Sequence, residues 1–218
     1  WFSVYLTVAF TAVAMALTIA CAYPLTRPEL KGRKFFTTLV VITMYFSGGI
    51  LPLYVLIKTL GMLNTMWSLI LPLAVSPFNL IILRTSLMSV PDSITESALI
   101  DGASYFRILT RIILPLSLPI IATLSLFYAV GRWNLFQDAL FYISDAKKYT
   151  LQLKLALIVI NNTSPEVFLL EGADAGYRIV PAAMTAATVI IATVPILAAY
   201  PWLQRYFISG VMMGSVKG

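Results

Sequence analysis

The residues with the most constrained types and spacing lie in one polar stretch, Glu96–Pro115, which reads ESALIDGASYFRILTRIILP. An acid and a small residue are followed by a glycine, then nine residues, then the group I-x-L-P. On a helix, Ala98 and Gly102 lie four positions apart on one face, where another protein surface could approach closely. The stretch therefore favours docking of a protein partner, and the alternative is an ordinary connecting loop with a capped helix.

The residue types that most catalytic and metal sites require are missing. The chain has no histidine, which excludes a Cys/His zinc site and any Ser–His or Cys–His nucleophile pair. The single cysteine, Cys21, lies in an apolar run, and we interpret it as a small buried hydrophobic residue. No G-x4-G-K-[ST] phosphate loop occurs. We expect a non-catalytic chain that binds no metal or cofactor and hydrolyses no ATP by itself.

The composition places the chain in a lipid bilayer. Hydrophobic residues make up 60% of the 218 residues and charged residues 11%, with a mean hydropathy of +0.90. Soluble domains carry about 25% charged residues, so this chain could not cover a surface that faces water. Lys and Arg outnumber Asp and Glu by 15 to 9, but they are scattered at the ends of apolar runs. This distribution favours membrane topology over nucleic-acid binding.

Apolar runs long enough to cross the hydrocarbon predict an all-α fold, a polytopic transmembrane helical bundle with five visible spans. Glycine and proline interrupt the second run, and proline and asparagine occur within the third. The chain opens at Trp1 without methionine, so we expect the N-terminal region to be missing and the whole protein to have six spans. The predicted spans are Val4–Tyr23, Phe35–Ile57, Trp67–Met88, Ile113 to about Val130 or Leu140, and Val180–Leu203.

The short loops predict the orientation of this single transmembrane domain, residues 1–218. Loop 24–34 carries four basic residues and one acid, which places it in the cytoplasm by the positive-inside rule. Alternation then places residues 89–111 in a cytoplasmic loop, 144–179 in an extracytoplasmic loop and 204–218 in a cytoplasmic tail. Within the outer loop, Leu155–Ile160 is too short to span and predicts an interfacial helix or packed cap, followed by a turn at Asn161–Pro165.

Local signals predict the shape of the polar stretch. Pro91 suits the first turn of a helix, and Ser93–Glu96 fits a capping box. The helix should run for two to three turns to Asp101, where Gly102 can adopt the left-handed backbone that ends it. Ser104 can cap a second helix, Tyr105–Arg111, and Pro115 sets the angle of re-entry into the bilayer.

The stretch also resembles the EAA loop, E-A-A-x3-G-x9-I-x-L-P, of permease subunits in binding-protein-dependent ABC importers, with Ser97 in place of one alanine. Four further segments are similar to the same family, and together they cover nearly the whole chain. They resemble carbohydrate importers of the maltose type, nearest the branch for complex or uronate-containing oligosaccharides. The segments are AYPLTRPELKGRKFF, FSGGILPLYVLIKTLGMLNTMWSLILP, FYAVGRWNLFQDAL and QRYFISGVMMGSVKG.

This resemblance implies an ATP-driven oligosaccharide importer in the bacterial inner membrane. The implied partners are a homologous second permease, usually a different chain, two cytoplasmic ATPase subunits that bind ATP and Mg, and an extracytoplasmic solute-binding protein. The polar stretch would then couple ATPase closure to alternating access, and the tail 204–218 would also touch the ATPases. The implied coupling residues are Glu96, Ser97, Ala98, Asp101, Gly102, Ile112, Leu114 and Pro115.

Polar residues and helix breaks at membrane depth mark candidate positions in a sugar pathway. The alternative is that Asn79 bonds to a neighbouring helix and that Trp133 is an interfacial anchor. Arg84 is interpreted as a snorkelling anchor, with a functional charge as the alternative. The candidate pathway residues are Ser47, Asn79, Trp133, Asn134, Gln137 and Asp138, and the candidate contacts to the binding protein are Asn161, Asn162, Glu171, Asp174 and Arg178.

Two other function classes remain to be weighed. A stand-alone secondary carrier or channel for a small polar solute would be expected to carry acids inside its spans, yet only Asp138 comes close. An intramembrane enzyme would need histidine or paired acids on facing spans. A carrier would work alone after purification, whereas a permease subunit would be inert without its ATPases.

Overall fold

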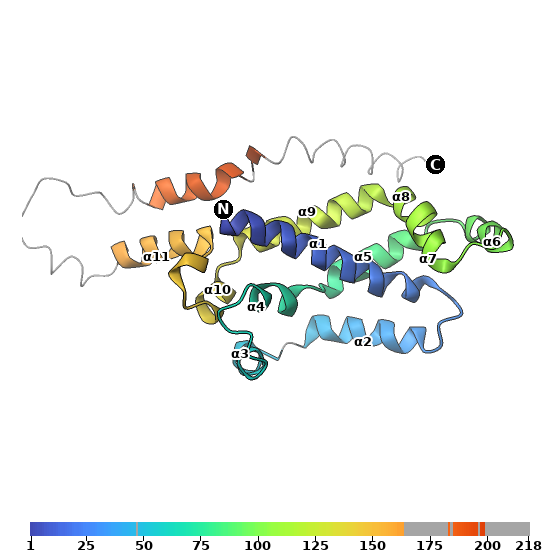
Figure 1. Ribbon diagram of the computed structural model, residues 1–218, viewed down its shortest axis with the longest axis horizontal. Helices are drawn as coiled ribbons and strands as arrows, with labels where there is room; N and C mark the ends of the chain where they lie inside the picture. The colour runs from blue at the N-terminus through green and yellow to red at the C-terminus, as the bar shows by residue number, and fades with distance from the viewer. Residues whose placement is uncertain (47, 164–182, 184, 196, 199–218) are drawn as a thin grey trace, which may run out of the picture.

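The computed structural model describes residues 1–46, 48–163, 183, 185–195 and 197–198. Within these residues every regular element is a helix, and the long helices lie roughly side by side (Figure 1). The predicted all-α helical bundle is therefore confirmed.

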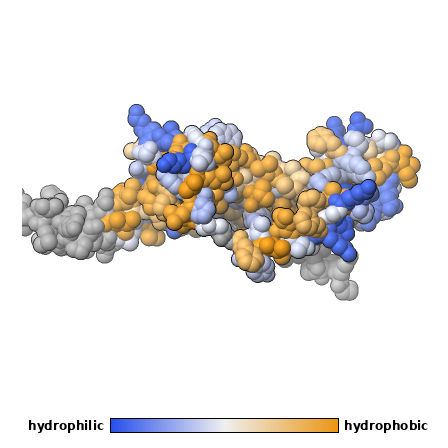
Figure 2. All heavy atoms as spheres, turned by 90° about the horizontal axis from the view of Figure 1, so that it is seen from below, coloured by the Kyte–Doolittle hydropathy of each residue, from blue (hydrophilic) through white to orange (hydrophobic). Residues whose placement is uncertain are grey.

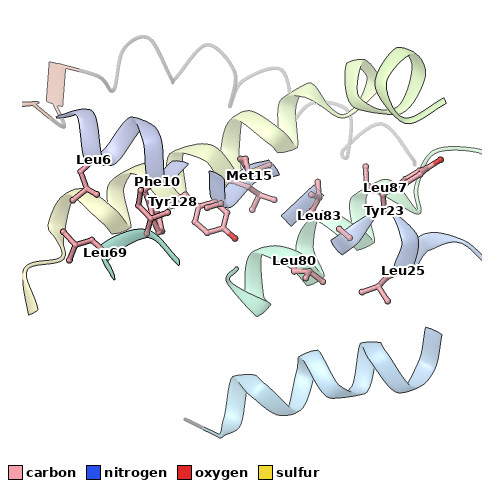
Figure 3. Close-up of a cluster of buried hydrophobic side chains, with 14 of the residues drawn as sticks. Leu6, Phe10, Met15, Tyr23, Leu25, Leu69, Leu80, Leu83, Leu87 and Tyr128 are labelled. Carbon is pink, nitrogen blue, oxygen red and sulfur yellow. The ribbon is translucent and has the colours of Figure 1, made fainter. Parts of the chain in front are cut away.

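The core of the bundle forms around α1 (Phe2–Ala22), which packs most extensively against α9 (Leu118–Asn134) and also against α5 (Pro77–Leu87). Figure 3 shows a file of buried side chains along α1, from Leu6 and Leu69 at one end to Tyr23 and Leu25 at the other. A stripe at four-residue spacing is what one face of a helix presents to its neighbours. The buried stripe on α1 is Leu6, Phe10, Ala14, Thr18 and Ala22.

Cys21 lies outside this stripe and is exposed on α1. The prediction of a buried cysteine was wrong. An apolar run could not show which of its residues face the core, because a membrane helix is apolar on both its inner and outer faces.

The predicted second span consists of two helices, α2 (Arg33–Tyr45) and α3 (Ile50–Thr59), which are bent by 114° relative to each other. Gly49 has φ 82° and ψ 175°, a backbone conformation that essentially only glycine adopts. The interruption predicted at Gly48-Gly49 is therefore confirmed, whereas the one predicted at Pro52 was wrong, because Pro52 lies in the first turn of α3, where its missing N–H breaks no helical bond.

The third span is also broken. It consists of α4 (Trp67–Ile70), a short 3-10 turn η2 (Leu71–Leu73) and α5, with a bend of 54° at the break. Pro72 and Pro77 each lack the N–H that a continuous helix would use. Ser76 caps α5 by accepting a hydrogen bond from the Asn79 N–H at 3.4 Å.

Tyr128 of α9 ties this break to α1. Its hydroxyl accepts a hydrogen bond from the Ser76 N–H at 3.0 Å and lies 2.7 Å from the Thr18 hydroxyl, in a buried site. Its ring meets Phe10 edge to face at 6.0 Å between centroids. The Ser76 N–H, which the break leaves without a helical acceptor, therefore bonds to the Tyr128 hydroxyl. In a bilayer such backbone groups must find their partners within the protein.

The segment between α5 and α9 protrudes from one end of the bundle (Figure 1). It contains α6 (Asp92–Ile100), α7 (Tyr105–Ile108), a π-helical turn η3 (Leu109–Ile113) and α8 (Leu114–Leu116). The 3-10 turn η1 (Pro24–Thr26), which follows α1, lies at the same end, because the Arg84 Nε of α5 donates to the Leu25 carbonyl at 3.0 Å.

The opposite end carries α10 (Gln137–Tyr142), the 3-10 turn η4 (Ala146–Lys148) and α11 (Leu151–Thr163). The helix expected near Leu155–Ile160 is confirmed as part of α11. The turn predicted at Asn161–Pro165 was wrong for its first three residues, because α11 continues through Thr163, and its last two residues lie outside the described residues. Pro165 is the only proline in this segment, and a proline disfavours helix only for itself and the residue before it.

Among the described residues, one helix, Phe2–Thr26, is long and apolar enough to cross a membrane, and the number rises to four if each bent pair is one span. These positions match the first four predicted spans. The fifth, Val180–Leu203, lies only partly within the described residues, where Thr185–Pro195 is a shorter apolar helix. Figure 2 shows hydrophobic side chains over most of the middle of one face and hydrophilic ones toward the ends.

Candidate functional site

The polar stretch forms a short helix, α6, as predicted, but its start differs. Pro91 occupies the cap position with φ −58° and ψ 133°, no side chain caps the helix, and Asp92 is the first helical residue. Ser93 is therefore already inside the first turn, where its hydroxyl cannot act as the cap, and the predicted capping box was wrong. Asp92 lies in the first turn of α6, where its negative charge interacts favourably with the positive end of the helix dipole.

The C-terminal end of α6 has the predicted glycine stop. Gly102 has φ +79°, and its N–H donates to the Leu99 carbonyl at 3.0 Å. The Ala103 N–H donates to the Ala98 carbonyl at 2.9 Å. This pair of bonds is a Schellman motif, which satisfies carbonyls that a helix end leaves open. A Cβ added to Gly102 would meet no atom within 4 Å, so the surface around it is open.

The faces of α6 differ from the prediction at one residue. Ala98 is 9% exposed and joins the hydrophobic core, so it is not part of a smooth exposed spot with Gly102. The helix turns Thr95 and Ala98 inward because residues three apart share a face. Its outward surface includes Glu96, Ser97, Ile100, Asp101 and Gly102, with Ile100 86% exposed.

The return to the bundle runs through α7, η3 and α8. Ser104 caps α7 as predicted, since its hydroxyl accepts from the Arg107 N–H at 3.4 Å. The segment Tyr105–Leu116 then meets α9 at 82°, immediately after Pro115. Ile112 and Leu114 are half-buried and Pro115 is exposed. The apolar end of the motif therefore anchors α6 to the bundle.

A contact that the sequence did not suggest ties this segment to α1. The Tyr23 hydroxyl donates to the Tyr105 carbonyl at 3.2 Å. The Arg27 guanidinium lies 4.6 Å from the centroid of the Tyr23 ring and 6.0 Å from that of Tyr105. These cation–π and hydrogen-bond contacts attach α7 to the end of the central helix.

The candidate pathway residues fall into three environments. Asn79 is 5% exposed in the first turn of α5. Trp133 is half-buried, and its Nε1 donates to the Ala192 carbonyl at 3.2 Å. Asn134, the last residue of α9, and Gln137, the first residue of α10, are both exposed. Ser47 lies outside the described residues, so its proposed role stays a prediction.

Asp138 already has a partner, Arg132, which sequence reasoning missed. The two form a bidentate ion pair through both carboxylate oxygens, and the arginine side chain is fully buried. The available signal was an arginine in the apolar helix α9 with an acid six residues later. Burial, together with the nearby Asp138 charge, raises the pKa of the Tyr142 phenol above its ordinary value.

The candidate contacts to a binding protein are largely beyond what the structure describes. Asn161 and Asn162 lie in the last turn of α11. Glu171, Asp174 and Arg178 lie outside the described residues. These positions remain predictions.

Comparison with known proteins places the chain among transport permeases. The family model described as "Binding-protein-dependent transport system inner membrane component" matches residues 4–212. Protein LplC of Bacillus subtilis is 45% identical over 218 residues, which cover 99% of this chain and 72% of LplC. The polygalacturonan/rhamnogalacturonan transport system permease protein YtcP of the same organism is 44% identical over 216 residues, covering 99% and 75%.

A solved structure is also similar. The crystal structure of a bacterial ABC transporter involved in the import of the acidic polysaccharide alginate matches with a TM-score of 0.83 and 28% sequence identity. The match covers 94% of this chain and 73% of that chain. The family match, the relatives and the shared fold agree, and this chain belongs to the family of binding-protein-dependent transport system inner membrane components.

Proposed function

We propose that this chain is the membrane-spanning permease subunit of an ATP-driven importer of oligosaccharides. It works with a second permease, two cytoplasmic ATPases that bind ATP and Mg, and an extracytoplasmic binding protein. The chain itself is non-catalytic, and its α6 docks in an ATPase groove. The observation that carries this proposal is the position of α6, a short helix with an exposed polar face at one end of an apolar bundle.

The contacts around α6 support a coupling role. Ala98 is packed in the core, α7 is bonded to Tyr23, and η3 and α8 continue toward α9. A displacement of α6 would therefore move α1 and α9 as well, because packed helices shift as units rather than deform continuously. The exposed residues Glu96, Ser97 and Asp101 are the side chains that would meet the ATPase.

The two ends of the bundle support the proposed orientation. The basic loop 24–34 and the α6–α7 segment share one end through the contacts of Arg27 and Arg84. The loop 58–66 and the start of the 144–179 segment share the other, because the Asp145 N–H donates to the Asn64 Oδ1 at 3.1 Å. The two loops assigned to the cytoplasm, one from its charge and one by alternation, are thus neighbours, and so are the two assigned outside.

The proposed cargo class is uronate-containing oligosaccharides. YtcP is described as a polygalacturonan/rhamnogalacturonan permease, and the matched structure comes from an importer of alginate, another acidic polysaccharide. The pathway candidates include Asn134 and Gln137, whose exposed carboxamides can both donate to and accept from sugar hydroxyls and carboxylates.

The test is co-purification of the complex from membranes after co-expression with its partner subunits. Gly102→Asp places a charged side chain at the open end of α6, and Gly61→Asp is the matched control at the opposite end of the bundle. Both glycines have positive φ, +79° and +67°, and in neither case does an added Cβ meet an atom within 4 Å. The backbone strain of the two variants is therefore similar, about 1–2 kcal/mol.

We expect Gly102→Asp to lose the ATPase subunits but keep the second permease, and Gly61→Asp to keep both. If the native chain co-purifies with no ATPase subunit, the proposal is overturned, and a stand-alone secondary carrier or channel becomes the better hypothesis. If both variants lose the ATPase subunits equally, the loss results from backbone strain, and α6 is not the helix that docks on the ATPase.

A further inference from the structure

Arg132 is a buried cation that the proposed coupling mechanism does not use. The residue is 3% exposed at the C-terminal end of α9. Its Nη1 donates to the Leu69 carbonyl at 3.1 Å and to Asp138 Oδ2, and its Nη2 donates to the Leu135 carbonyl at 3.3 Å and to Asp138 Oδ1 at 2.9 Å. One guanidinium therefore binds three acceptors, one from α4 and two from the junction of α9 and α10.

Each of these acceptors lies where a helix breaks. The Leu69 carbonyl is in the last turn of α4, and Leu135 follows the end of α9, so neither carbonyl has a full set of helical partners. Asp138 lies in the first turn of α10, and its Oδ1 also accepts from the Ala139 N–H at 2.8 Å. Arg132 thus supplies hydrogen bonds at two breaks, the end of α4 and the junction of α9 and α10, and joins them through one guanidinium.

Stability alone gives a poor reason to keep this ion pair. Burying two charges costs several kcal/mol per ion, and well-packed apolar residues would often serve a fold as well or better. An ionisable residue at membrane depth is expensive, and where one occurs it commonly marks a functional element. The planar guanidinium offers fixed directions to its acceptors, a property that apolar packing lacks.

The pair closes the junction between α9 and α10, residues 133–137, which is called here the clamped turn. Trp133 is bonded to the Ala192 carbonyl, which fixes the first residue of the turn. Asn134 and Gln137 are exposed, and neither side chain makes a hydrogen bond within the part of the chain that the structure describes. The clamped turn therefore presents two carboxamides from a rigid base.

We propose that Arg132 and Asp138 are positioning residues for transport, which hold the clamped turn so that Asn134 and Gln137 meet the transported sugar. The inference rests on the proposed function for its cargo, an oligosaccharide rich in hydroxyl groups. Carboxamides held in one orientation recognise such a ligand with less entropic cost than mobile ones. Neither residue needs to touch the sugar itself, because the Arg132 side chain is fully buried and the Asp138 side chain, 10% exposed, is already paired with it.

Two variants test the clamp in the whole complex, reconstituted in lipid vesicles with its binding protein. Arg132→Lys keeps the charge, but the single ammonium of a lysine cannot reproduce the planar guanidinium that binds Leu69, Leu135 and Asp138 at once. The double variant R132M/D138L replaces the pair by apolar residues and leaves no buried charge unpaired. The control is Asp145→Asn, because Asp145 forms an exposed ion pair with Lys148 at 3.9 Å near the same end.

The first readout is amide hydrogen exchange over residues 133–137, which needs no transport. We expect exchange to rise about tenfold in both variants and to stay unchanged in the control. The second readout is the sugar-dependent ATPase rate of the complex. We expect the half-saturating sugar concentration to rise about fivefold while the maximal rate stays within about twofold, since only ligand geometry changes.

Each outcome decides the matter. Unchanged exchange in both variants overturns the clamp. Faster exchange with an unchanged half-saturating sugar concentration shows that the ion pair stabilises the fold and does not position the carboxamides for sugar. Failure of both variants to assemble also shows that the pair stabilises the fold, and it overturns the proposed role in transport. If the native complex responds to no sugar, the proposed function fails, while the exchange data still report whether the clamp exists.

Discussion

Replacing Tyr128 by phenylalanine tests whether one hydroxyl at the centre of the bundle holds three segments together. Tyr128 is 5% exposed, and its hydroxyl bonds to the Thr18 hydroxyl at 2.7 Å and to the Ser76 N–H at 3.0 Å. The substitution keeps the ring and its edge contact with Phe10. It therefore removes the polar contribution and little else.

The expected cost follows from these two bonds. Hydrogen bonds between membrane helices contribute about 0.6 kcal/mol on average and about 1.7 kcal/mol at most. Two bonds therefore predict a loss of about 1–3 kcal/mol in the free energy of unfolding. We expect the upper half of this range, because Ser76 lies at the break before α5, and without the Tyr128 hydroxyl its N–H is left without a hydrogen-bond acceptor.

The assay is reversible unfolding in detergent micelles titrated with SDS. Tyr142→Phe is the matched control, because Tyr142 is 6% exposed and its hydroxyl makes no hydrogen bond among the described residues. That variant should change stability by less than about 0.5 kcal/mol. Thr18→Val, alone and combined with Tyr128→Phe, should give a coupling energy of about 1 kcal/mol. The reasoning is refuted if Tyr128→Phe is no more destabilising than Tyr142→Phe.

Two further predictions concern the outer end and the cargo. Asn64 has φ 59° and accepts from the Asp145 N–H, so Asn64→Ala should lower stability by about 2 kcal/mol through strain and a lost bond. Asn64→Gly should cost only about 1 kcal/mol, and thermal unfolding in detergent that reverses this order would contradict the account. For the cargo, oligogalacturonate should stimulate ATP hydrolysis by the whole complex more than a neutral malto-oligosaccharide does. Equal stimulation by the two sugars would contradict the proposal that the cargo is a uronate-containing oligosaccharide.

Much of the fold could be predicted from hydropathy alone. The first four spans match helices or bent pairs of helices, because a bilayer demands about 20 apolar residues with every backbone group bonded within the segment. The stop of α6 at Gly102 and the cap at Ser104 were also predictable, since both depend on local backbone conformation and on hydrogen bonds to near neighbours.

Other features depended on contacts between residues distant in sequence. The 114° bend between α2 and α3 requires an angle that a glycine permits but does not choose. The burial of Ala98 depends on which face of α6 meets the bundle, and the identity of a small residue does not show whether it faces the core or a partner protein. The same ambiguity concealed the exposure of Cys21.

The sequence by itself determined the class of protein, the first four membrane segments and the position of the polar stretch Glu96–Pro115, because composition and local spacing carry that information. Only the tertiary structure decided which polar groups in the bundle are already paired. Arg132 is the clearest case, since its acceptors come from α4, the end of α9 and α10, and the one from α4 is 63 residues away in sequence. A buried charge is tolerated only where such partners converge, and convergence is a property of the folded bundle.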